Sequence, residues 1–147
     1  MVKDTNFLYK LSSIRQTAFS FLERGMKKAG LVDIPPSYGD ILYLIHNQVH
    51  HQKTGYIKDI VDRSNKDKST VSNIINHLEK KGYVRKMPDP EDGRRTMVRL
   101  TPLAESHTEA MFDISRDLRH RLFRNMSEEE QKILFLLLEK VEKNLKI

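Results

Sequence analysis

The chain of 147 residues contains no cysteine. This absence excludes disulfide bonds, thiolate catalysis, cysteine redox sensing and most structural zinc sites. The chain also has no apolar run approaching the roughly 18 residues that cross a membrane. Its opening segment, MVKDTNFLYK, places an acid and polar residues where a signal peptide needs a basic region followed by an apolar one. We therefore expect a soluble, cytoplasmic protein.

The common signatures of catalysis are missing as well. There is no glycine-rich phosphate loop, no Gly-x-Ser-x-Gly elbow and no His-Glu-x-x-His pair. His46 and His50 are four residues apart with His51 beside them, a spacing that can bind zinc or nickel. Without cysteine or a suitably spaced carboxylate this ligand set is incomplete. We predict no enzyme, no cofactor and no metal site, although metal binding by these histidines stays open.

Positive charge is concentrated in the middle third of the sequence. The net charge is +6, and residues 53–99 hold twelve lysines and arginines against seven aspartates and glutamates. This segment therefore carries nearly all of the excess. A generic basic surface would have spread the charge, so the concentration indicates a polyanionic partner met by one region of the molecule.

Apolar periodicity predicts helices over most of the chain. The expected helices lie at residues 1–30, 37–49, 56–61, 68–82, 102–122 and 127–145. Ser37, Thr101 and Ser127 are the expected N-caps of the second, fifth and sixth helices. Gly82 is expected to end the fourth helix in the left-handed conformation.

Between the fourth and fifth helices the period changes from helical to extended. YVRKM and RRTMVRL are two short strand candidates, and the loop PDPEDG between them is typical of a hairpin. Three helices followed by a two-stranded wing form a winged helix-turn-helix. We predict a mainly α fold with a small β-hairpin wing, in which residues 37–101 are the DNA-binding lobe.

The flanking helices carry more apolar surface than a small monomer can cover. ILFLLLEKV, residues 133–141, is apolar around more than half of its helix. The first helix has a narrow seam of Phe7, Leu11, Ile14, Ala18 and Phe21. Pairing with a second copy would bury both surfaces. We therefore predict that residues 1–36 and 102–147 form the dimerisation region of a homodimer.

The helix at residues 68–82 has two faces of different chemistry. One face has Val71, Ile74, Ile75 and Leu78 at the spacing that must face a core. The opposite face consists of short polar side chains, which are mediocre helix formers and include no acid before Glu79. Such groups can reach base edges and phosphates in a major groove, although a plain surface helix is the alternative. The predicted DNA-binding residues on this face are Lys68, Ser69, Thr70, Ser72, Asn73, Asn76 and His77.

The hairpin supplies the second half of the predicted interface. Arg94 and Arg95 follow directly on the loop, so their guanidinium groups could enter an adjacent minor groove. Asp92 lies two residues before Arg94, close enough to pair with it and fix its direction. An ordinary charged turn is the simpler interpretation of the hairpin alone, but a polar helix followed at once by a basic wing is far more specific.

Residues 67–101, DKSTVSNIINHLEKKGYVRKMPDPEDGRRTMVRLT, resemble the recognition helix and wing of the MarR family of transcriptional regulators. The shared features are S-T-V-S at the helix start, L-E-K-K-G-Y-V at its end, D-P-x-D-x-R in the wing and V-x-L-T before the next helix. Weaker similarity of pattern extends over nearly the whole chain. Asn73 stands where many relatives have arginine, and PPSYGDIL replaces their frequent L-T-x-x-Q.

The resemblance implies a homodimer on a pseudo-palindromic operator of double-stranded DNA. Each recognition helix would lie in a major groove, and Arg94, held by Asp92, would be the wing-tip arginine in a minor groove. Many relatives release DNA when a small phenolic or other lipophilic acid binds between the dimer helices and the lobes. We therefore expect a homodimeric repressor with a possible effector of this kind.

Other functions remain to be weighed against this expectation. A winged-helix dimer that binds other proteins and not DNA is the principal alternative, and the acid-free helix face and Arg94 count against it. An enzyme with a concealed site would be recognised by turnover of a small molecule. RNA binding is disfavoured, because no stacking aromatic side chains lie on the predicted face.

Overall fold

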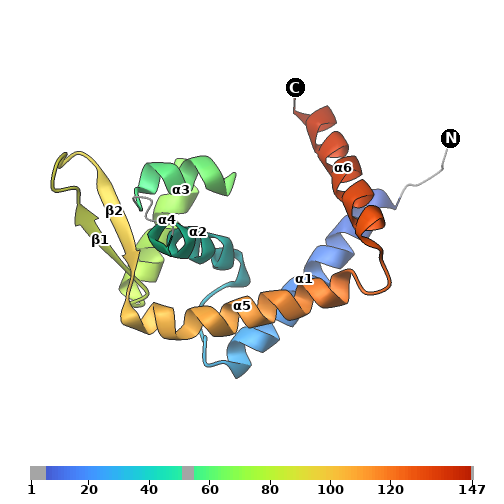
Figure 1. Cartoon of the computed structure of the whole chain (residues 1–147), viewed down its shortest axis with the longest axis horizontal. Coiled ribbons are helices and arrows are strands. Elements are labelled where there is room, and N and C mark those ends of the chain that lie inside the picture. Colours follow the sequence, from blue (N-terminus) through green and yellow to red (C-terminus); the bar gives the residue numbers. More distant parts are fainter. Residues whose placement is uncertain (1–5, 51–54, 147) are drawn as a thin grey trace.

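The computed structural model describes residues 6–50 and 55–146. The elements in chain order are α1 (Phe7–Lys28), the 3-10 helix η1 (Pro36–Tyr38), α2 (Gly39–His50), α3 (Ile57–Ser64), α4 (Lys68–Lys80), β1 (Val84–Pro88), β2 (Thr96–Leu100), α5 (Pro102–Leu122) and α6 (Glu128–Leu145). Figure 1 shows the short helices and the hairpin gathered at one end and the long helices extending to the other. The predicted fold class, mainly α with a two-stranded antiparallel wing, is confirmed.

The hydrophobic core lies mostly within the lobe, and Met26, Leu31, Ile34 and Ala104 complete it from the flanking segments. Helices α2, α3 and α4 and strand β2 contribute side chains that are almost completely removed from water, which is the dominant stabilising term in folding. The largest of these are Ile41, Ile45, Ile60, Val71, Ile75, Leu78 and Val98. The apolar stripe predicted for the recognition helix is therefore buried as a whole.

The helix boundaries around α4 follow from local chemistry. Asn65 ends α3 with φ 54°, a left-handed conformation that asparagine tolerates. Asp67 then caps α4 by accepting a hydrogen bond from the Thr70 N–H. At the other end Gly82 has φ 78°, and the Tyr83 N–H donates to the Leu78 carbonyl at 2.9 Å. The predicted left-handed glycine is thus in place, and it turns the chain into β1.

The N-cap predicted for the second helix is wrong. Pro35 is extended, and Pro36 begins a 3-10 turn in which the Tyr38 N–H donates to the Pro35 carbonyl. Ser37 lies inside this turn, and α2 begins after it at Gly39. The other two predicted caps are confirmed. The side chain of Thr101 accepts from the Ala104 N–H, and Ser127 forms a capping box with Glu130.

The first strand has the predicted length but begins one residue later, at Val84, and the second is two residues shorter than its candidate because it begins at Thr96. β1 and β2 pair antiparallel with Lys86 opposite Val98, and the loop between them runs from residue 89 to 95. The hairpin is fastened to the lobe through its outer edge, where the Val98 N–H donates to the Gly55 carbonyl at 2.7 Å. Since the Val98 side chain is buried in the core, the wing is part of the lobe and moves with it.

The long helices form a separate layer with little core of its own. α1 runs alongside α5, and α6 projects from the end of α5 (Figure 1). No residue of α6 is buried, and Leu136 and Leu137 are 64% and 54% exposed. The seam of α1 is also open, with Ile14 51% exposed. Among the described residues, no helix combines the length and apolar character needed to cross a membrane.

Replacing Gly55 by alanine should destabilise the lobe. A Cβ atom there would lie 2.4 Å from the Val98 carbonyl oxygen, a backbone atom that cannot turn aside. We expect Gly55→Ala to lower the free energy of unfolding by about 1–3 kcal/mol, as overpacking usually does. Gly93→Ala is the matched control, because nothing lies within 4 Å of its added Cβ. Urea unfolding of both variants measures the difference, and equal midpoints would contradict the expectation.

Candidate nucleic-acid interface

The outer face of α4 presents polar side chains in one row. Ser69, Asn73 and Asn76 are exposed, at the i, i+4, i+7 spacing that aligns residues along a helix. Ser72 is half-buried at the edge of this row, on the side of the wing. Because the apolar stripe is buried on the opposite side, the row faces away from the lobe. The helix therefore offers donors and acceptors without any acid among them.

The first turn of α4 divides its polar groups between capping and the open surface. Asp67 accepts from both the backbone N–H and the hydroxyl of Thr70, at 2.8 and 2.9 Å. These bonds, the backbone one first, lower the pKa of Asp67. The Thr70 hydroxyl is thus committed as a donor and has only acceptor capacity left for a partner. Lys68 and Ser69 are exposed beside it.

His77 lies at the margin of the polar face. Its Nδ1 is 3.0 Å from the hydroxyl of Tyr38, and the two rings meet edge to face. The imidazole is half-buried as a result, on the side of α4 that faces η1. Of the seven residues predicted on this helix, His77 is the one whose side chain is held by another element away from the wing.

Arg94 is an almost fully exposed cation of the wing. Its side chain is 94% exposed, and its Nε donates to Asp92 Oδ1 at 3.3 Å. The Arg94 backbone N–H donates to the same oxygen at 3.1 Å, which closes a tight turn. Asp92 therefore holds the base of Arg94 and leaves the rest of the side chain free to extend outward.

Arg95 lies against the lobe instead of extending like its neighbour. Its guanidinium stacks 4.6 Å above the ring of Tyr56, the residue that precedes α3. The Tyr56 hydroxyl donates to Asp89 Oδ2 at 2.7 Å, and the Glu91 N–H donates to the other oxygen. The bond from the Glu91 N–H, followed by that from Tyr56, lowers the pKa of Asp89. The carboxylate therefore stays ionised, and able to accept both bonds, below the usual titration range of aspartate.

Sequence reasoning missed Tyr56 and Asp89 as parts of this arrangement. Asp89 looks like one of several loop acids, yet it is only 7% exposed. Tyr56 is 33 positions away in the sequence, so no spacing rule connects the two. The contact that joins them fixes the loop that carries Arg94.

A hollow of about 620 Å³ lies between α3, the start of α4 and the wing. Four cations reach it, together with two acids and three hydroxyl side chains. They are Lys58, Lys68, Arg94, Arg95, Asp59, Asp62, Tyr56, Ser72 and Thr96. Cations and hydroxyls in this number suit a phosphate oxygen of a nucleic-acid backbone.

The histidine cluster of α2 lies only in part within the described structure. His46 packs edge to face on Phe112, with ring centroids 5.0 Å apart. The side chains of His50 and His51 lie outside the described residues. Within residues 6–50 and 55–146, no group of three or more histidines, aspartates or glutamates is arranged to hold a metal ion.

Known proteins with similar sequences contain the same kind of domain. Residues 40–104 match a winged-helix DNA-binding domain. The HTH-type transcriptional repressor IacR of Pseudomonas putida is 29% identical over 137 residues, which cover 93% of this chain and 78% of that protein. The sequence likeness therefore extends well beyond the winged-helix lobe.

Solved structures share the fold over nearly the whole chain. MepR of S. aureus, in a complex with DNA, has a TM-score of 0.80 with 24% identity and covers 95% of this chain and 98% of its own. MarR has a TM-score of 0.64 with 19% identity and covers 91% and 93%. The chain contains a winged-helix DNA-binding domain and shares the fold of MepR and MarR. These matches agree with the predicted DNA-binding transcriptional regulator.

The wing-tip arginine gives a direct test of the candidate DNA interface. We expect Arg94→Ala to weaken binding to operator DNA by about 1–3 kcal/mol, because a charged side chain would be lost from the minor groove. Lys28→Ala, which removes an exposed cation from α1, should change affinity far less. Fluorescence anisotropy at moderate salt measures both variants. If Arg94→Ala binds operator DNA with unchanged affinity, the wing-tip arginine is not part of the DNA interface.

Proposed function

We propose that the protein is a MarR-family regulator, a cytoplasmic homodimeric repressor that binds a pseudo-palindromic operator near its own gene. The observation that carries the proposal is the polar row of α4, flanked by the exposed Arg94 of the wing. One lobe supplies one recognition helix and one wing, which suits half of an operator. Two lobes related by a two-fold axis would then contact two half-sites.

The exposed apolar surface of the long helices supports the homodimer. Six large apolar side chains of α6 are between 37% and 76% exposed. They are Ile133, Leu134, Phe135, Leu136, Leu137 and Leu145. A soluble monomer rarely carries an apolar surface of this extent, and a symmetric interface would bury it in both copies. We accordingly propose residues 1–36 and 102–147 as the dimerisation region and residues 37–101 as the DNA-binding lobe.

Repression is the regulatory direction that one relative supports. IacR, which is similar over nearly the whole of this chain, is a transcriptional repressor. A dimer bound over a promoter would block it simply by occupying it.

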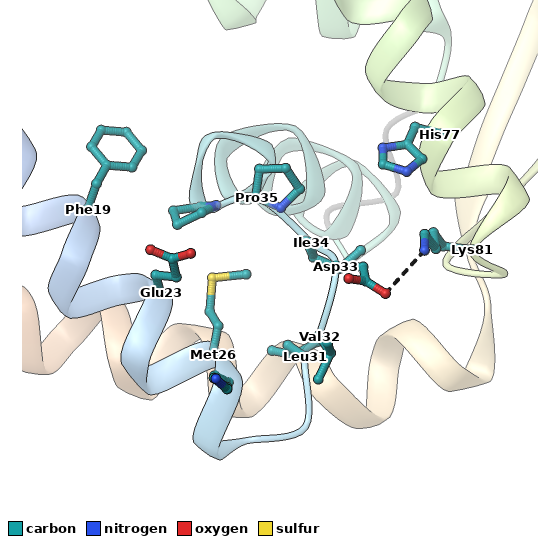
Figure 2. Close-up of a pocket in the computed structure, with 12 residues that line it drawn as sticks. Phe19, Glu23, Met26, Leu31, Val32, Asp33, Ile34, Pro35, His77 and Lys81 are labelled. Carbon is teal, nitrogen blue, oxygen red and sulfur yellow. Dashed lines mark hydrogen bonds and ion pairs between the residues drawn. The ribbon is translucent and has the colours of Figure 1, made fainter.

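A hollow between α1 and the lobe supports control by a small molecule. It has a volume of about 830 Å³ and is lined by Phe19 and Met26 of α1, the loop before η1, and His77 and Lys81 at the end of α4. Figure 2 shows these groups around one space, with Lys81 paired to Asp33 at 3.5 Å. We propose a phenolic or other lipophilic acid as the ligand. A ligand there would contact the recognition helix and could shift it relative to α1.

The decisive experiment is binding to DNA measured by fluorescence anisotropy across a salt series. One duplex comes from upstream of the gene, and the other is a shuffled version. We expect binding to the first that is about a thousandfold tighter and falls steeply with salt. Equal, weak binding to both would favour a protein-binding dimer instead. Adding salicylate and related aromatic acids to the complex tests release by an effector.

The proposed dimer interface is tested by a charge in α6. Leu137→Glu should weaken dimerisation or folding, because it would bury a carboxylate in an apolar interface. Lys132→Glu, which changes an exposed polar position of the same helix, is the control. Sedimentation velocity at several concentrations distinguishes dimer from monomer. A Leu137→Glu protein that stays dimeric would show that this part of α6 is outside the interface.

A further inference from the structure

Three side chains join the recognition helix to the first strand of the wing. The Nζ of Lys86, on β1, donates to Asn76 Oδ1 of α4 at 2.7 Å. The same ammonium lies 3.5 Å from Glu79 Oε1, one turn further along the helix. The other carboxylate oxygen of Glu79 accepts from the Lys86 backbone N–H at 3.3 Å. Glu79 therefore holds both ends of Lys86, and the ammonium is kept against the amide of Asn76.

The chemistry of this contact fixes which end of the Asn76 amide faces the strand. A lysine ammonium has three donors and no acceptor, so the group opposite it must be the amide oxygen. The NH2 group of Asn76 is consequently directed away from Lys86. Asn73, one turn earlier, differs in this respect, because within the described residues no hydrogen bond restrains its side chain. Its amide can adopt either orientation.

The orientation of an asparagine amide decides what it can read in a major groove. The side chain presents a donor on one side and an acceptor on the other, and adenine is recognised by using both in the correct order. A rotation of the amide by half a turn exchanges donor and acceptor. An amide that turns freely can bind base edges with either order of donor and acceptor, whereas a fixed amide can bind only one order.

We propose that Lys86 is a specificity-determining residue of the interface. It acts as a positioning residue, by locking the Asn76 amide in one orientation and so restricting the base edge that Asn76 can contact. This inference rests on the proposed function, since it requires that α4 lie in a major groove.

The charge balance around Lys86 supports positioning over simple attraction to DNA. The Lys86 side chain is 32% exposed and is paired with a Glu79 side chain that is 41% exposed. A lysine whose charge is already balanced by Glu79 adds little net attraction for phosphates. Arg94, by contrast, keeps a side chain that is almost fully exposed. The ion pair also explains how the acid Glu79 is tolerated beside the polar row of α4, because Lys86 neutralises its charge.

The test compares base preferences of the full-length protein and its variants. The operator found by anisotropy is randomised over one half-site, and bound DNA is selected and sequenced. We expect Lys86→Met to reduce discrimination at one base pair of the half-site by about tenfold or more, with the other positions unchanged. Asn76→Ala should lose discrimination at the same base pair. Lys86→Arg, which keeps a donor-only cation, should retain the wild-type preference.

Arg85→Met is the matched control, since it removes one positive charge from the adjacent, exposed position of β1. It should leave the base preferences unchanged. Thermal melting of every variant verifies that the wing is folded. An unchanged preference in Lys86→Met would overturn the inference. So would a loss of affinity that is uniform over all sequences and accompanied by a smaller salt slope, because that result identifies a phosphate contact.

The same experiment separates this inference from the proposed function. If the wild-type protein selects an operator and Lys86→Met shows the same base preferences, the proposed regulatory function is supported and only the positioning role of Lys86 is rejected. If the wild-type protein selects no sequence at all, the proposed function is overturned and the inference falls with it.

Discussion

Burial of one side of α4 is the constraint on which the recognition surface depends. Val71, Ile75 and Leu78 are completely buried, and each contributes about 1.5–3 kcal/mol that would be lost on exposure. The helix therefore cannot turn about its own axis, and its polar row is fixed toward the outside. Local chemistry sets where the helix begins and ends, with Asp67 at one end and Gly82 at the other. Together these effects present a row of short polar groups in a single direction.

The wing depends on the same core. Val98 anchors β2 among the buried side chains, and the backbone of Gly55 completes the edge of the hairpin. Beyond this point the loop is held by Tyr56 and Asp89, which leave Arg94 extended. Helix and wing are thus rigidly related, and a rigid relation between two DNA-contacting elements limits the sequences and groove shapes that they fit.

The molecule divides into a lobe that holds most of the core, completed by Met26 of α1 and Ala104 of α5, and an exposed helix α6. Among the described residues nothing buries the apolar surface of α6, so the proposed dimer would complete this half. The two halves meet at the hollow between α1 and the end of α4, where Lys81, the residue after α4, pairs with Asp33 of the loop that follows α1. A shift of α1 could therefore reach the end of α4 through this loop. This connection gives the proposed effector a physical route to DNA binding.

The sequence by itself determined the order of helices and strands, the buried stripe of α4 and the caps at Thr101 and Ser127, because each depends on neighbours within a few residues. It failed at Ser37, where the two prolines before it imposed a 3-10 turn. Only the tertiary structure decided that Arg95 stacks on the lobe while Arg94 extends, and that Lys86 holds Asn76. These contacts join residues that are far apart in the sequence or on different elements, and no periodicity or spacing encodes where two such side chains meet.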